Sequence, residues 1–181
     1  MFALLILAIF LTGCGEENVD VALKLRSKLE KSAGCQFDAT VTADYADKLY
    51  VFEISCRSDQ NGTVFFTVLS PASIAGITGT VSEAGGKLTF DDRVLAFEML
   101  ADGMISPVTG PWLMVSGIRG GYIHACGKYD SGYQVQIDDS FRGEKLQTQL
   151  YLDENGVPTG AEFLYKNRRI LSLKVSNFVF V

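Results

Sequence analysis

The stretch CQFDATVTADYADKLYVFEISC, residues 35–56, decides the fold. In both of its halves, apolar residues or cysteines alternate with polar residues, which is the pattern of strands that bury one face. A turn at Tyr45-Ala46 would make the two halves an antiparallel hairpin. The residues that then oppose one another are all apolar or cysteine: Cys35 and Cys56, Phe37 and Ile54, Ala39 and Phe52, and Val41 and Tyr50. Since a slip of one residue would exchange the two faces, this register is well specified.

The same register bears on the two cysteines that begin and end the stretch. Directly opposed strand residues lie within reach of a disulfide. A bridge between Cys35 and Cys56 would close a loop of about 20 residues and stabilise the fold by about 3 kcal/mol on the chain-entropy model. We expect this bridge if the protein meets an oxidising compartment, and the alternative is two buried free thiols. Cys126 would then be either a buried thiol or the link to a second chain.

The rest of the chain predicts two helices and further antiparallel strands. Before the hairpin, residues 18–31 have apolar side chains at helical spacing, which predicts a helix that ends at Gly34. Residues 112–119 predict a second helix, ended by Gly120-Gly121. The expected strands cover residues 62–70, 78–83, 87–90, 93–97, 122–129, 133–138, 146–153, 161–166 and 170–180. Sequential hairpins of this kind favour a large curved sheet or an open barrel.

The N-terminus has the pattern of an export signal. Its apolar run, Phe2 to Leu11, is too short for a membrane span, which needs about 20 residues. The stretch Leu11-Thr12-Gly13-Cys14 is similar to the lipobox of bacterial lipoproteins, in which the cysteine receives a diacylglycerol; the alternative is an ordinary signal peptide. No Lys or Arg precedes the run, which indicates a start upstream. The expected segments are a signal peptide over 1–13, a lipidated terminus and linker over 14–17, and one domain over 18–181.

Composition and motifs argue against several classes of function. The 16 basic and 21 acidic residues give a net charge of −5 without a basic cluster, so we expect no nucleic-acid binding. One histidine and widely spaced cysteines predict no metal site, and no nucleotide-binding loop is present. His124 and Cys126 lie two positions apart on a strand, beyond hydrogen-bond reach. The acidic pairs Asp91-Asp92 and Asp138-Asp139 fall at apparent strand ends and are typical of turns. We expect no enzyme and no cofactor.

Two further stretches carry a resemblance to a known family. VLSPASIAGITGTVSEAGGKLTFDD, residues 68–92, contains a strand ended by proline, a short plug-like segment and a hairpin with a glycine turn. ISPVTGPWLMVSGIRGG, residues 105–121, is similar to a segment of Gram-positive lipoproteins such as the germination lipoprotein GerS. With the helix-first order and the lipobox, the chain resembles the LolA/LolB/LppX-like superfamily in a germination-lipoprotein-like variant.

The resemblance implies an α+β, mostly antiparallel fold: an open, incomplete β-barrel of about ten to eleven strands with an N-terminal helix and a central helical plug. It implies that the concave face takes up acyl chains. The residues expected to line that face, or alternatively to form an ordinary core, are Phe37, Val41, Tyr50, Phe52, Ile54, Phe66, Val68, Trp112, Leu113 and Met114. Carriers of this family tether a helical lid with an arginine, and none of Arg93, Arg119 and Arg142 matches that arginine.

The expected function is therefore binding without catalysis. We expect a lipoprotein on the outer face of a bacterial membrane, held there by membrane lipid through the diacylglycerol on Cys14, that binds lipid or acyl chains. The alternative is a protein-interaction scaffold at the cell or spore surface, as a monomer or a homodimer.

Overall fold

The computed structural model describes residues 16–82, 89–90, 100–103, 105–141 and 144–181. Cys14, the expected signal peptide, Asp91-Asp92 and the strand expected at 93–97 lie outside these residues. The elements in chain order are α1 (Glu16–Lys31), β1 (Cys35–Asp44), β2 (Leu49–Ser58), β3 (Val64–Ser70), β4 (Thr78–Val81), β5 (Thr89–Phe90), η3 (Pro107–Thr109), α2 (Gly110–Gly120), β6 (Tyr122–Tyr129), β7 (Gly132–Phe141), β8 (Glu144–Leu152), β9 (Pro158–Tyr165) and β10 (Arg168–Phe180).

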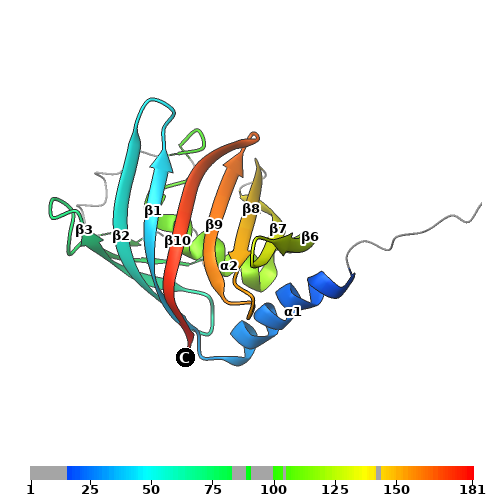
Figure 1. Cartoon of the computed structure of the whole chain (residues 1–181). Helices are drawn as coiled ribbons and strands as arrows, with labels where there is room; N and C mark the ends of the chain where they lie inside the picture. The colour runs from blue at the N-terminus through cyan, green and yellow to red at the C-terminus, as the bar shows by residue number, and fades with distance from the viewer. Residues whose placement is uncertain (1–15, 83–88, 91–99, 104, 142–143) are drawn as a thin grey trace, which may run out of the picture.

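The strands form one antiparallel sheet in the order β5-β4-β3-β2-β1-β10-β9-β8-β7-β6. The first and last long strands, β1 and β10, pair at its centre. Since β5 and β6 are the two ends of this order, the described sheet is open, as expected. Figure 1 shows the sheet curving in front of α2, with α1 along its lower right edge. No helix among the described residues has the length and apolar character that a membrane span requires.

The register of the first hairpin differs from the expected one by two residues. Cys56 lies opposite Phe37 instead of Cys35. The cause is the turn: the backbone N–H of Ala46 donates to Oδ1 of Asp44 at 2.7 Å, and Ala46 adopts a φ of 73°. This arrangement lengthens the loop to residues 45–48. Because the shift is an even number of residues, both strands still bury the faces that their alternation predicts.

The shifted register also removes the expected disulfide. Cys35, Cys56 and Cys126 are free and buried, so the predicted Cys35–Cys56 bridge is wrong for this structure. Cys35 instead lies against Ser58, whose Oγ is 3.2 Å from the Cys35 Sγ and accepts a hydrogen bond from the Cys35 backbone N–H. Cys126 is only 8% exposed, which favours its reading as a buried thiol over a link to a second chain.

We expect these three thiols to be unreactive in the folded protein and to react together on unfolding. Burial raises the pKa of each of Cys35, Cys56 and Cys126, so little reactive thiolate forms at mildly alkaline pH. The measurement is labelling with Ellman's reagent without reductant, on protein carrying Cys14→Ser, with and without urea. Three equivalents should appear in urea. A single equivalent, from Cys126 alone, would show that the Cys35–Cys56 bridge forms after all.

Candidate functional site

Helix α2 lies on the inner face of the sheet and contacts β3, β7, β8 and β10. Pro107 and Pro111 are suited to the first positions of η3 and α2, where no backbone N–H donor is needed. Leu113, Met114 and Ile118 are at most 3% exposed. Gly110 permits the close approach, because a Cβ there would lie 2.9 Å from Cδ2 of Leu171. The helix therefore covers an apolar surface that the strands alone would expose.

The residues expected to line the concave face are mostly brought together beneath α2. Eight of the ten are buried in the single core cluster: Phe37, Val41, Phe52, Ile54, Phe66, Val68, Leu113 and Met114. Trp112 is partly buried against that cluster. Tyr50 lies apart, at the turn end of β2, where it is 45% exposed and packs edge-on against Tyr45. The concave face is thus apolar as predicted, and α2 occupies it.

An arginine of α1 ties α2 in place. Arg26 donates from Nε to the backbone oxygen of Ile118 at 2.7 Å and from Nη2 to that of Gly121 at 2.6 Å. Ile118 lies in the last turn of α2 and Gly121 directly follows the helix, a place where helix carbonyls lack partners inside the helix and the dipole favours a positive charge. Sequence reasoning missed Arg26 because it sits on an amphipathic helix among other charged residues. The one indication in the sequence was that Arg26 borders the apolar face of the helix, which Ala22, Leu25 and Leu29 form.

A second arginine fixes the same end of α2 to the β2–β3 turn. Arg119 donates from Nη2 to the backbone oxygen of Gln60 at 2.8 Å, while its Nη1 is buried without a hydrogen-bond partner. It lines a cavity of about 280 Å³ between α1, α2 and this turn, with Glu30 and Trp112. The sequence reading found no tethering role for Arg119, whereas the structure gives it this contact with the turn.

Two further hollows are lined by described residues on the outer face of the sheet. One, of about 790 Å³, lies over β10, β1, β2, β3 and β4. The other, of about 590 Å³, lies over β1, β10, β9 and β8 and the β6–β7 turn. The second contains a network in which the Tyr151 hydroxyl lies 3.2 Å from Oε2 of Glu162, whose Oε1 accepts from Arg169 at 2.7 Å. Burial and then the Glu162 charge raise the pKa of Tyr151, so its hydroxyl stays protonated at neutral pH.

The candidate catalytic residues are not gathered into a site. His124 is exposed and Cys126 is buried, with a bulge in the β6–β7 pairing between Ile123 and Ala125. Asp138 and Asp139 pair with β8 inside β7, so their predicted turn position is wrong. No group of three His, Cys, Asp or Glu residues in the described part of the chain could hold a metal ion.

Several solved structures are similar to this chain. The LolA superfamily protein NE2245 from Nitrosomonas europaea matches at 10% identity over 87% of this chain and 92% of its own, with a TM-score of 0.41. LprF from Mycobacterium bovis matches at 11% identity over 90% and 92%, with a TM-score of 0.44. A putative outer membrane lipoprotein-sorting protein domain from Vibrio parahaemolyticus matches at 8% identity over 91% and 92%, with a TM-score of 0.41.

Each of these is a likeness of fold to one solved structure, the first of which is described as a LolA superfamily protein. The germination-lipoprotein-like variant stays a prediction. No protein-family model matches the sequence, and no curated protein sequence matches it significantly.

Proposed function

We propose that the protein is a non-catalytic, lipid-anchored protein of the bacterial cell envelope that binds acyl chains on the concave face of its sheet. The observation that carries the proposal is the composition of helix α2, which occupies that face. Helix α2 covers a continuous apolar surface, yet its sequence GPWLMVSGIRG contains three glycines. Gly110 and Gly120 lie at the two ends of the helix, and Gly117 in its interior costs about 1 kcal/mol relative to alanine. An apolar ligand could therefore take the place of a helix that is intrinsically weak.

The tethers support α2 as a displaceable plug. Arg26 and Arg119 both hold its C-terminal end, through backbone carbonyls of Ile118, Gly121 and Gln60. Loss of these few polar contacts would free that end while the strands beneath keep their own pairing. The plug would then open at its C-terminal end, beside α1.

The proposed anchor would place this opening near the bilayer. Only Gly15 separates Cys14 from the start of α1 at Glu16. A diacylglycerol on Cys14 would insert stably into the membrane, because two acyl chains bury many CH₂ groups at about 0.8 kcal/mol each. α1, and with it the Arg26 tether, would lie close to the source of acyl chains.

A second candidate function is a protein-interaction scaffold. The β1–β2 hairpin ends in three consecutive exposed apolar residues, Leu49, Tyr50 and Val51, at 65%, 45% and 55% exposure. Leu49 and Val51 share one face of β2 and Tyr50 lies on the other, so both faces at this end of the hairpin expose apolar side chains, which favours a contact with a partner.

Acyl binding can be tested with the lone tryptophan, Trp112, which lies on α2. The full chain carrying Cys14→Ser is titrated with cis-parinaric acid in the absence of detergent. We expect saturable energy transfer from Trp112 to the probe. Arg26→Met should strengthen binding, because displacing α2 then breaks fewer hydrogen bonds, whereas Lys24→Met, an exposed change on the same helix, should not.

The membrane anchor is tested separately, by cell fractionation. The unmodified protein should fractionate with membranes and the Cys14→Ser form should not.

Absence of saturable transfer in both the Cys14→Ser protein and its Arg26→Met variant would contradict acyl binding. The scaffold would then be the better account. A membrane fraction that does not depend on Cys14 would separately contradict the anchor.

A further inference from the structure

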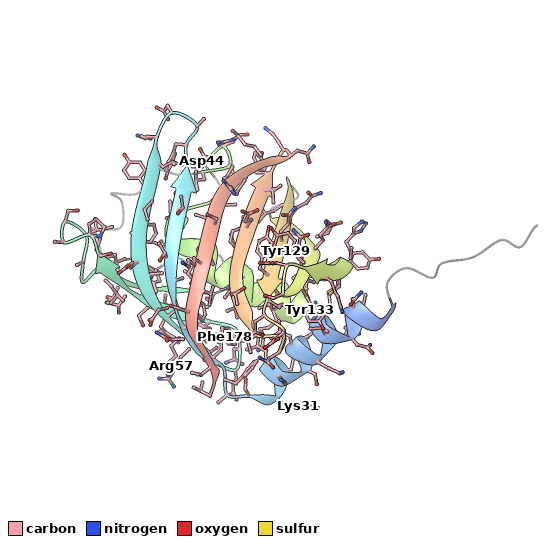
Figure 2. The ribbon with its side chains drawn as sticks, viewed as in Figure 1. Lys31, Asp44, Arg57, Tyr129, Tyr133 and Phe178 are labelled. Atoms are coloured by element: carbon pink, nitrogen blue, oxygen red, sulfur yellow. The ribbon has the colours of Figure 1, made fainter. Side chains whose placement is uncertain are left out.

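The larger outer hollow, which we call the outer groove, lies on the face of the sheet opposite α2. It has a volume of about 790 Å³, within the range of ligand sites. Figure 2 shows Arg57, one of its residues, at the lower end of the sheet, toward the C-terminus. Phe37 and Phe66 belong to the lining of both sites, but their side chains are buried in the core beneath α2, so the exposed side chains of the groove are not those proposed to bind acyl chains.

Strand register arranges the side chains of the groove in two rows that cross the sheet. In the first row, Gln36 lies opposite Arg57, Arg57 opposite Phe65, and Phe65 opposite Thr80. The second row runs two residues along each strand. There, Asp38 lies opposite Ser55, Ser55 opposite Thr67, and Thr67 opposite Thr78. Neighbouring strands are about 4.8 Å apart, so each row presents a side chain at that interval.

The two rows differ in chemistry. The second row is polar throughout, and a bulge in the β1–β10 pairing adds Asn177 to it. Asn177 donates from Nδ2 to Oδ2 of Asp38 at 2.9 Å, which fixes both side chains and leaves other acceptor and donor positions free. The first row contains an aromatic ring, Phe65, that is 47% exposed. A ligand here would meet hydrogen-bonding groups along both rows and, in the first row, the face of a ring.

Charge and backbone pairing narrow the class of ligand. Among the described residues that line the groove, Arg57 and Asp38 are the only ones with charged side chains, and their signs are opposite, so this lining matches a ligand without net charge. The groove lies on the face of five paired strands, not at a sheet edge, so an extended peptide cannot bind by adding a strand. Short hydroxyl and amide side chains beside an exposed ring suit a molecule with many hydroxyls and flat apolar faces.

We propose that the outer groove binds a neutral oligosaccharide. A pyranose ring would place its C–H face on the Phe65 ring, and its hydroxyl or acetamido groups would bond the second row. The interval between strands is close to the length of one sugar in an extended β-linked chain, so successive sugars would meet successive strands. The uncharged backbone of a cell-wall glycan has this chemistry.

The test is an amide-shift titration by nuclear magnetic resonance of the full chain carrying Cys14→Ser, with N-acetylglucosamine tetramer and cellotetraose as probes. We expect saturable shifts gathered on β1–β4 and the end of β10 with at least one probe, and little dependence on added salt, because the ligand is neutral. Phe65→Ala should weaken binding about tenfold, the loss expected for an aromatic contact. Leu69→Ala should leave it unchanged.

Leu69 is the matched control because it lies on β3, is 50% exposed and does not line the groove. Shifts with neither probe would overturn the proposal, as would shifts gathered elsewhere or equal binding by Phe65→Ala and Leu69→Ala. A strong loss of binding on adding salt would also overturn it, since hydrogen bonds and ring contacts with these uncharged probes should not be screened by salt. None of these outcomes depends on parinaric acid binding, so the two functions can fail independently.

Discussion

Replacing Arg26 with methionine is expected to lower the free energy of unfolding by about 3 kcal/mol, because it removes two hydrogen bonds from a charged donor, each worth about 1.5–3 kcal/mol. The bonds join residues 92 and 95 positions apart and are partly buried. Methionine keeps an unbranched apolar stem, so the change isolates the guanidinium. Without it, the backbone oxygens of Ile118 and Gly121 lose their charged partner between the two helices.

The measurement is urea unfolding followed both by Trp112 fluorescence and by far-ultraviolet circular dichroism. Lys24→Met is the matched control, because Lys24 is exposed on the same helix and forms none of the hydrogen bonds described here. We expect a change below about 0.5 kcal/mol for that control, as for most surface substitutions. Equal stability of the Arg26 and Lys24 variants would show that the contact does not hold α1 and α2 together.

The second large effect is expected at Gly34, between α1 and β1. Its φ of 144° is a backbone conformation that residues with a side chain rarely adopt, and a Cβ there would collide with the backbone oxygen of Ser58. That oxygen belongs to the β2 backbone and cannot move without disturbing the sheet. We expect Gly34→Ala to lower the free energy of unfolding by about 4 kcal/mol or more, a size that is exceptional for one substitution and that a steric collision in the core can cause.

Gly76→Ala separates the collision from the backbone strain. Gly76 also has a positive φ, of 84°, but a Cβ there would meet no atom within 4 Å. Its substitution should cost about 1 kcal/mol, the penalty of a left-handed conformation alone. Urea unfolding of both variants is the comparison, with soluble yield as the readout if Gly34→Ala does not fold. Equal losses at the two positions would contradict the predicted collision.

Much of the fold was predictable because it depends on periodicity. The alternation of apolar and polar residues in 35–56 assigned the buried faces of β1 and β2 correctly, because every second residue of a strand points to the same face of the sheet. The spacing of apolar residues also predicted α1 and α2 to within two residues at each end. The exact register was not predictable, because registers two residues apart bury the same side chains. A local hydrogen bond from Ala46 to Asp44 chooses between them.

The candidate sites were less predictable because they arise between elements far apart in the sequence. Arg26 looks like any other charge on an exposed helix face until α2 is placed beside it. The outer groove involves the solvent-facing positions of five strands, which read simply as polar alternation. Phe65 was the exception, an aromatic ring on the polar face. The apolar lining was predictable because it shares the core-facing positions of the same strands.

The central pairing of β1 with β10 sets the entropic cost of completing the sheet. Within the described sheet, β10 alone joins β1–β5 to β6–β9. Until β10 pairs with β1, the chain holds two half-sheets that are not joined, and the pairing that joins them brings together residues from opposite ends of the described chain. Because contacts of this sequence separation slow folding, we expect the joining of the two half-sheets to be the slow step in the folding of this protein.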